Sequence, residues 1–224
     1  MRSLAGSSEE DRTAAAKGTL LETVGLTRAF GDLVVLDRIS FSLHEGEAAA
    51  VVGPNGSGKT TLLRCVVGTD EADEGHVLLD GTELDETSPS VRPAVASALD
   101  DVAFFPDLSV VEHLRLYSWA HGTSSPDELV ENVLRDLGLA LAADQLPATL
   151  SSGQQRRLAL ASCFVRPRRL LVLDEPEQRL DVAGRRWLVE RLKAEKSAGT
   201  AVLLASHDDD LVGAVADLLV EVGS

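Results

Sequence analysis

Short apolar runs, each about the length of a strand, follow one another in the first part of the chain. They lie at residues 20–26, 34–43 and 47–53. The second run alternates apolar and polar positions, which predicts a half-exposed strand. The third is almost entirely apolar, which predicts a strand buried on both faces. A fourth run, at 75–81, ends in an Asp-Gly turn and predicts another short strand.

In the second half of the chain, amphipathic helices alternate with apolar strands. Such alternation is typical of a parallel sheet that carries helices on both of its faces. A helical block interrupts the alternation, and we expect it to form a lobe of its own at about 101–165. The predicted helices begin near Lys59 and Ser152 and cover 109–120, 125–139 and 182–198, and the predicted strands cover 169–173, 200–206 and 218–222.

Length and charge limit the class of protein. With 224 residues, of which 44% are hydrophobic, the chain is long enough for one large domain with a buried core. We expect a disordered leader at 1–18, which is small and polar, followed by one domain at 19–224. The formal net charge of −15 argues against a nucleic-acid partner. No apolar run reaches the roughly 18 residues of a membrane span.

A glycine-rich stretch, GPNGSGKTT at 53–61, lies between the buried strand and the first helix. It matches the pattern G-x-x-x-x-G-K-[ST] in the strand–loop–helix context of a phosphate-binding loop. The glycines let backbone N–H groups turn towards a phosphate chain, and the helix N-terminus adds a favourable dipole. Lys59 is expected to reach the β- and γ-phosphates as a catalytic residue, and Thr60 to bind Mg²⁺. The candidate nucleotide-binding residues are Gly53, Pro54, Asn55, Gly56, Ser57, Gly58, Lys59, Thr60 and Thr61.

Two carboxylates end the apolar run RLLVLDEP at 169–176. Asp174, at the tip of the predicted strand, is placed to hold Mg²⁺ through its water shell. Glu175 is placed to orient or deprotonate an attacking water. A strand end capped by acidic residues is the alternative, and it would be credible if the phosphate-binding loop were absent. Together the two motifs indicate a nucleoside triphosphatase without saying of which kind.

The stretch LSSGQQRRLAL at 150–160 narrows the kind, because here the chain resembles the ATP-binding-cassette (ABC) ATPases. Their signature reads LSGGQ and stands just upstream of an Asp-Glu strand, and Ser152 takes the place of its first glycine. The resemblance covers about residues 20–222. It implies that the signature helix N-terminus of one subunit completes the ATP site of another by donating to the γ-phosphate. The residues concerned are Ser151, Ser152, Gly153 and Gln154.

The resemblance also implies a fold and cofactors. The expected fold class is α/β, a P-loop NTPase core with a mostly parallel sheet, an N-terminal antiparallel β subdomain and a separate α-helical lobe. The expected cofactors are ATP and Mg²⁺.

Further positions match the family one by one. Phe30, in LTRAFGDL, lies where the family has an aromatic that stacks on adenine, with an ordinary core aromatic as the alternative. Asp181 ends PEQRLD, which is similar to the family's loop after the Asp-Glu strand, and this match makes it a candidate nucleotide-binding residue. Glu177 and Arg179 replace residues that are usually small or neutral in that loop. His207 follows the next strand and matches the switch histidine that contacts the γ-phosphate, which makes it a candidate catalytic residue.

One position departs from the family in a way that touches the chemistry. Family members usually have a glutamine about five residues before an aromatic-Pro-x-Leu-[ST]-Val run, and it meets the metal and the lytic water. Here the run is FPDLSV at 105–110, which places Asp100 at the glutamine position. Asp100 is therefore a candidate catalytic and metal-binding residue. Its ionised carboxylate can coordinate Mg²⁺ but cannot donate a hydrogen bond, and it would repel Asp174 and Glu175 unless metal lay between them.

Two neighbouring stretches carry weaker expectations. Phe104 and Phe105 stand on the loop that, in the family, borders the groove for a membrane subunit, so they are either anchors for that partner or buried between the two lobes. The basic stretch RPRR at 166–169 is interpreted as a solvated loop.

The leading hypothesis for function is the ATP-binding and ATP-hydrolysing subunit of a membrane ABC transporter. Two cassettes, either two copies of this chain or this chain and a paralogue, would close around ATP and drive a separate transmembrane permease subunit. The chain would then lie in the cytoplasm, peripheral on the inner face of the cell membrane. The compact length slightly favours an exporter-type cassette, with import left open and the substrate unassigned.

Two other functions stay open. A soluble, non-transport ABC ATPase of DNA repair or chromosome structure would need a long coiled-coil or zinc insert, and 61–150 shows no sustained heptads. A degenerate cassette that binds ATP as a regulatory switch is kept open by Asp100, whereas Lys59, Asp174, Glu175 and His207 count against it.

The assignment of Asp100 gives a first prediction. If Asp100 occupies the glutamine position, Asp100→Gln removes a charged oxygen ligand and changes the Mg²⁺ dependence or the rate of ATP hydrolysis. Turnover measured across a Mg²⁺ titration checks this. A change confined to folding stability would instead support a purely structural acidic turn.

Overall fold

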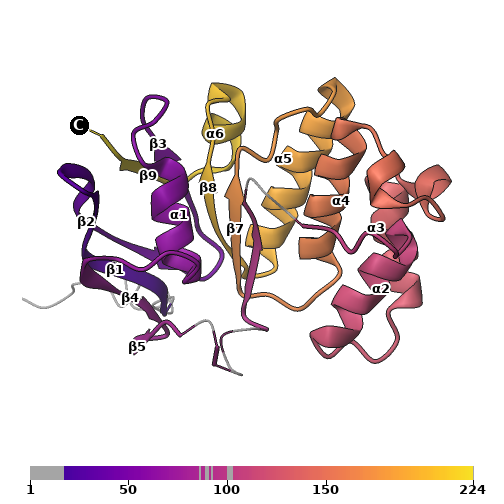
Figure 1. The fold of residues 1–224 in the computed structure, drawn as a ribbon, viewed down its shortest axis with the longest axis horizontal. Coiled ribbons are helices and arrows are strands. Elements are labelled where there is room, and N and C mark those ends of the chain that lie inside the picture. The colour runs from indigo at the N-terminus through magenta and orange to yellow at the C-terminus, as the bar shows by residue number, and fades with distance from the viewer. Residues whose placement is uncertain (1–17, 86, 89–90, 92, 100–102, 224) are drawn as a thin grey trace, which may run out of the picture.

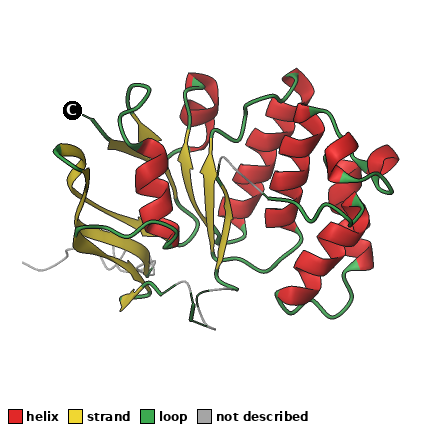
Figure 2. Ribbon diagram, viewed as in Figure 1, coloured by secondary structure: helices red, strands yellow, loops and turns green. Residues whose placement is uncertain are grey.

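The described part of the chain forms two β-sheets with helices packed against them (Figure 1, Figure 2). The structure is a computed structural model, and the residues that it describes are 18–85, 87–88, 91, 93–99 and 103–223. The predicted leader lies outside these residues except for Gly18. The α/β class with one antiparallel and one parallel sheet confirms the expectation from the sequence.

The first sheet is antiparallel and is built from the N-terminal part of the chain. Its first two strands pair along almost their whole length, from Thr19 opposite His44 to Phe30 opposite Leu33. The turn between them therefore holds Phe30 at one end of the sheet. The strand order is β2-β1-β4-β5, and the strands are β1 (Thr19–Phe30), β2 (Leu33–His44), β4 (Glu74–Leu79) and β5 (Thr82–Glu83).

The second sheet is parallel throughout, so the carboxyl ends of its strands meet at one edge. The run 95–98 was not predicted as a strand, because four residues give too short a pattern, and its pairing with residues 170–173 defines it. The order is β6-β7-β8-β3-β9, and the strands are β6 (Val95–Ala98), β7 (Leu170–Asp174), β8 (Ala201–Ala205), β3 (Ala48–Val52) and β9 (Leu218–Glu221).

The helices cover both faces of the parallel sheet. One face meets α1, which packs between the two sheets, and the other meets α4 and α5, with α2 and α3 beyond them (Figure 1). The helices are α1 (Lys59–Val67), α2 (Val110–Ala120), α3 (Asp127–Asp136), α4 (Ser152–Phe164), α5 (Val182–Ser197) and α6 (Asp209–Val215). Two 3₁₀ turns, η2 (Ala140–Ala142) and η3 (Pro147–Thr149), connect α3 to α4.

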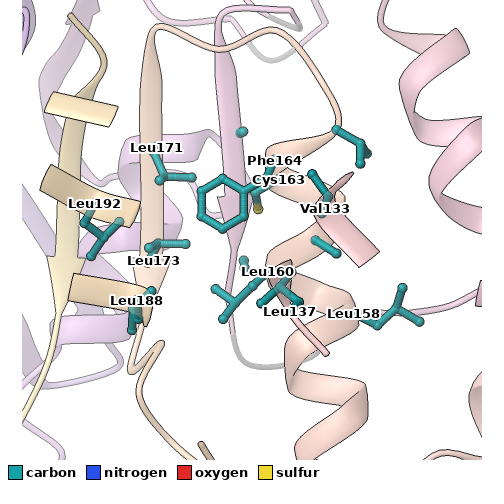
Figure 3. Packing of buried hydrophobic residues seen from close by; sticks show 14 of the residues in the cluster. Val133, Leu137, Leu158, Leu160, Cys163, Phe164, Leu171, Leu173, Leu188 and Leu192 are labelled. Carbon is teal, nitrogen blue, oxygen red and sulfur yellow. The ribbon is translucent and has the colours of Figure 1, made fainter. Parts of the chain in front are cut away.

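Successive residues of the central strands supply two separate cores. Leu171 and Leu173 of β7 pack on the side of α4 and α5, whereas Leu170 and Val172 pack on the side of α1. Figure 3 shows Leu171 and Leu173 facing Phe164 of α4, with Leu188 and Leu192 of α5 beside them. A strand with both faces buried must be apolar at every position, which explains its continuous apolar run.

The basic stretch at 166–169 is largely not a solvated loop, so that expectation is wrong. Arg168 forms a buried ion pair with Glu195, 2.5 Å between Nη2 and Oε1, with side chains only 12% and 7% exposed. Its guanidinium also lies over the ring of Phe164, 5.2 Å from the centroid. Arg166 donates to the carbonyl of Val95. These arginines join the loop between α4 and β7 to β6 and to α5.

Phe164 gives a prediction about stability. Its side chain is 2% exposed, meets Trp187 edge to face at 5.7 Å, and lies under the guanidinium of Arg191 at 4.6 Å. We expect Phe164→Ala to lower the free energy of unfolding by about 3–5 kcal/mol, because a large cavity remains. Urea denaturation measures this. Leu141→Ala, at a fully exposed side chain, is the control and should change stability by less than about 0.5 kcal/mol.

Candidate nucleotide site

The glycine-rich loop after β3 is held tightly on two sides. Gly58 has φ +100°, and a Cβ there would lie 2.5 Å from Cγ1 of Val35 on β2. A Cβ on Gly53 would lie 2.3 Å from the carbonyl oxygen of Val222, just beyond β9. Only glycine fits at either position, since any side chain would push the loop away from a neighbouring strand. The first N–H groups of α1 have no partner within the helix, so they face the space in front of this loop.

Lys59, the first residue of α1, lies inside the loop. Its side chain donates from Nζ to the carbonyl oxygens of Gly53 and Pro54, both at 2.9 Å, and the residue is 6% exposed. The ammonium group is therefore held within the loop. A phosphate chain bound by the loop amides would lie within its reach. Asn55, Gly56 and Ser57 form the rest of the loop, and Thr61 follows in α1.

The hydroxyl of Thr60 meets the first carboxylate of the Asp-Glu pair. Thr60 Oγ1 donates to Oδ2 of Asp174 at 2.6 Å, although the two residues are 114 positions apart in the chain. Asp174 ends β7 and is 2% exposed. Two hard oxygen donors side by side at the phosphate loop suit Mg²⁺.

Two protein oxygen ligands, from Thr60 and Asp174, are few for a metal site. No group of three or more His, Cys, Asp and Glu side chains among the described residues is placed to hold a metal ion. Mg²⁺ bound at Thr60 and Asp174 would therefore complete its coordination with phosphate oxygens and water, as Mg²⁺ commonly does.

Glu175 has a constrained backbone. Its φ is +44°, in the left-handed region that ordinary residues rarely adopt. The peptide group before it is held at both ends, because its N–H donates to the carbonyl of Ala205 at 2.8 Å and its carbonyl, that of Asp174, accepts from Arg156 of α4. The conformation is thus imposed by β8 and α4 together. Strained backbone at such a position is typical of functional sites.

The side chain of Glu175 lies near the histidine that follows β8. Oε1 of Glu175 is 3.5 Å from Nε2 of His207, and their side chains are 22% and 43% exposed. The structure therefore brings together a carboxylate and an imidazole from the ends of neighbouring strands. Either group could act on a water molecule beside a phosphate.

The start of α4 packs against the loop after Glu175. Ser151 caps the helix in a reciprocal pair with Gln154, whose N–H donates to Ser151 Oγ at 3.3 Å while Ser151 N–H donates to Gln154 Oε1 at 2.9 Å. A Cβ on Gly153 would lie 2.9 Å from the carbonyl oxygen of Arg179. Ser152, in contrast, is exposed. The signature therefore has one position with no room for a side chain and one with room.

An ion pair also links the same helix and loop. Asp181 caps α5 by accepting from the N–H of Gly184 at 2.8 Å, and Nη2 of Arg157 lies 3.0 Å from the same oxygen. The hydrogen bond from Gly184, with the Arg157 charge adding to it, lowers the pKa of Asp181. Asp181 is thus an ionised cap that fixes the loop to α4 and α5.

Phe30 is not a core residue, which removes one of its two interpretations. It is 51% exposed, and the guanidinium carbon of Arg28 lies 4.8 Å from its ring centroid. Arg28 is itself held by two ion pairs, from Nη2 to Oδ1 of Asp70 at 2.9 Å and from Nη1 to Oδ1 of Asp73 at 3.0 Å. A fixed cation thus supports the ring, and the adenine-stacking role stays a prediction.

The two phenylalanines on the loop before α2 differ in exposure. Phe104 packs partly buried against the core, and Phe105 is 50% exposed. Both rings contact His113 of α2, at 5.4 and 5.6 Å between centroids. Phe104 therefore matches the interpretation of burial, and Phe105 remains available to a partner. Asp100 lies outside the described residues, so its predicted place in the site stays a prediction.

Sequence reasoning missed the contacts that hold these groups in place. Arg156 and Arg157 are adjacent in GQQRR, yet one reaches the Asp174 carbonyl and the other reaches Asp181. Neighbours on a helix point in different directions, so two basic residues in a row could have suggested two separate contacts. Their partners are distant in sequence and carry no local signal.

A glycine-rich loop before a helix, an Asp-Glu strand end and a Ser-capped helix on one parallel sheet define a nucleotide-binding cassette. Residues 36–178 match the family described as ABC transporter. The chain belongs to this family. The resemblance to the ABC ATPases, stated from the sequence motifs, is confirmed.

Relatives of the chain include ATP-binding proteins named for import and for export. The spermidine/putrescine import ATP-binding protein PotA of Pseudomonas aeruginosa is 37% identical over 192 residues, covering 84% of this chain and 53% of that protein. The SkfA peptide export ATP-binding protein SkfE of Bacillus subtilis is 32% identical over 203 residues, covering 90% of this chain and 84% of that protein. The chain thus spans about half the length of PotA.

Solved structures show the same fold. An ATP-binding subunit of an ABC transporter has a TM-score of 0.85 and 28% identity, covering 91% of this chain and 86% of the other. A bacterial ABC transporter cassette solved as a dimer has a TM-score of 0.81 at 22% identity, covering 91% and 95%. Among the described residues of this chain, no helix is long and apolar enough to cross a membrane.

The exposed ring of Phe30 gives a prediction about nucleotide affinity. If adenine stacks on this ring, Phe30→Ala should weaken the free energy of ATP binding by about 1–3 kcal/mol, which raises the Kd for ATP by about 5- to 150-fold. Phe30→Tyr keeps the ring and should keep the affinity. Isothermal titration with MgATP measures both.

The control is Leu33→Ala on the same turn, where the side chain is 65% exposed and lacks a ring. It should leave the Kd for ATP unchanged. An unchanged Kd in Phe30→Ala would show that adenine does not stack there.

Proposed function

We propose that this cassette binds MgATP at the phosphate loop, hydrolyses it, and thereby drives a separate membrane permease. The observation that carries the proposal is the contact between Thr60 and Asp174 beside the pair formed by Glu175 and His207. Asp174 and Glu175 lie at the end of β7, and His207 follows the adjacent strand β8, so a metal-binding pair would stand beside a water-activating pair. ATP hydrolysis needs both, because the metal neutralises phosphate charge while a base orients the attacking water.

Each residue would have one task in this reaction. Lys59 binds the β- and γ-phosphates through its ammonium group, in place of the two carbonyls that it now contacts. Thr60 and Asp174 hold Mg²⁺, which stabilises the charge on the phosphates when it is bound. Glu175 orients or deprotonates the attacking water, and His207 contacts the γ-phosphate and keeps Glu175 in place. Asp100 remains a candidate further ligand.

A second cassette would complete the site. α4, which carries the signature, packs against α2, α3 and β6, whereas α1, which carries the phosphate loop, packs against β2, β7 and β8. The N-termini of α1 and α4, which would both bind phosphate, are thus packed against different elements. In a face-to-face pair, the N-terminus of α4 of one copy would approach the γ-phosphate held by the other. The similar cassette solved as a dimer supports this arrangement.

The membrane partner would dock near the loop before α2. Phe105 is exposed there beside the buried ring of His113, which is the pattern of an anchor at a protein interface. This would place the cassette at the inner face of the cell membrane. Because relatives are named for import and for export, we propose ATP-driven transport without assigning a cargo or a direction.

The role of Glu175 gives the prediction that tests hydrolysis. Glu175→Gln keeps the size of the side chain and removes the base, so we expect turnover to fall by about a hundredfold or more while ATP still binds. An ATP-bound dimer should accumulate and be visible by light scattering after gel filtration. Glu190→Gln, at an exposed position of α5, is the matched control and should hydrolyse ATP normally. Unchanged turnover in Glu175→Gln would remove Glu175 from this role.

The same trapped variant tests the partner. Isolated from solubilised membranes in ATP, it should bring down a protein with several membrane-spanning segments, identified by mass spectrometry. Reconstitution of that membrane protein with the parent cassette, in which Glu175 is intact, should give ATPase activity that depends on the membrane protein. Recovery of soluble partners alone would overturn the transport part of the proposal and leave ATP hydrolysis standing.

A further inference from the structure

A buried carboxylate lies on the loop between β7 and α5, two residues after Glu175. Glu177 is 7% exposed, and its Oε1 accepts from Ser206 Oγ at 2.6 Å. No described residue donates to its other oxygen, Oε2. Burying a carboxylate with one oxygen unpaired costs stability. The position therefore calls for an explanation beyond packing.

Ser206 ties this carboxylate to the turn that carries His207. The hydroxyl donates to Glu177 and accepts from the N–H of Asp208 at 3.0 Å. Asp208 in turn caps α6 by accepting from Leu211 N–H at 3.0 Å. The residues on both sides of His207 are thus fixed through one hydroxyl, and the direction of its proton is set by Glu177. A charged acceptor makes this a strong hydrogen bond, as the short distance indicates.

Three links then join residues 175–177 to residues 205–207. The backbone N–H of Glu175 donates to the Ala205 carbonyl at 2.8 Å, and Glu177 accepts from Ser206 at 2.6 Å. The third link is the 3.5 Å approach of Glu175 to His207. Glu175, Glu177, Ser206 and His207 form a closed ring of covalent and non-covalent contacts. Within it, the Glu177–Ser206 hydrogen bond is the side-chain link that is hidden from solvent.

We propose that Glu177 is a positioning residue that holds the Ser206–His207 turn, so that His207 stays beside Glu175. The proposal rests on the proposed roles of Glu175 and His207 in hydrolysis. Without the acceptor, the Ser206 hydroxyl is free to rotate, the turn at Asp208 loosens, and His207 moves relative to the base. Small displacements of catalytic groups lower turnover more than they lower substrate binding.

The test compares variants that keep or remove the acceptor. Glu177→Leu removes it at similar volume, Glu177→Gln keeps an acceptor oxygen, and Ser206→Ala deletes only the donor. Glu190→Leu makes the same chemical change at an exposed position and is the matched control. The kcat and KM for ATP are measured for each variant. The pH titration of the His207 imidazole is followed by NMR and assigned by its loss in His207→Ala.

We expect Glu177→Leu and Ser206→Ala each to lower kcat by about tenfold or more, with KM for ATP within about twofold. Glu177→Gln and Glu190→Leu should stay near the parent protein. The double variant that combines Glu177→Leu with Ser206→Ala should have a kcat no lower than that of either single variant, because both changes remove the same link. The His207 resonance should shift or broaden in Glu177→Leu and Ser206→Ala and remain unchanged in Glu190→Leu.

An unchanged His207 titration in Ser206→Ala, or losses that add in the double variant, would overturn the proposal. If Glu177→Leu fails to fold, Ser206→Ala still decides, since it leaves the carboxylate in place. Failure of the proposed function, ATP hydrolysis, can be told apart from failure of the positioning role of Glu177. A chain that does not hydrolyse ATP would lose the kinetic readout, whereas the His207 titration would still report whether Glu177 positions the turn.

Discussion

The carboxyl ends of parallel strands meet at one edge of the central sheet, and the whole site depends on that constraint. The loop after β3 carries the glycine-rich motif, β7 ends in Asp174, and β8 is followed by His207. Because the strands run in the same direction, residues more than a hundred positions apart become neighbours, as Thr60 and Asp174 show at 2.6 Å. These strands are buried on both faces, so packing on each side of the sheet fixes where they end.

The sequence predicted the parts of this arrangement that are local. The phosphate loop, the buried strand before it and the helix after it are contiguous, so one stretch of residues contains the motif and the context that supports it. The Ser-capped start of α4 was equally visible, since its capping residues stand three positions apart.

The missed features are those that depend on contacts between distant segments. β6 exists because Val95–Ala98 pairs with β7. Arg168 appeared solvated because its partner, Glu195, lies on α5, distant from it in the sequence. The roles of Arg156 and Glu177 follow only from which carbonyl or hydroxyl lies beside them in the fold. Hydrophobic periodicity holds no information on such pairs.

The contact between Gly153 and Arg179 has a consequence for how the signature tolerates change. With the carbonyl of Arg179 lying 2.9 Å from where a Cβ would stand, the second glycine of the motif is fixed by the loop behind it. The position before it faces outwards, and there this chain carries Ser152. Two neighbouring positions of the signature therefore differ in how far their side chains can change. Its outward position can vary without disturbing the packing of this domain, while its inward position keeps the helix seated on its own loop.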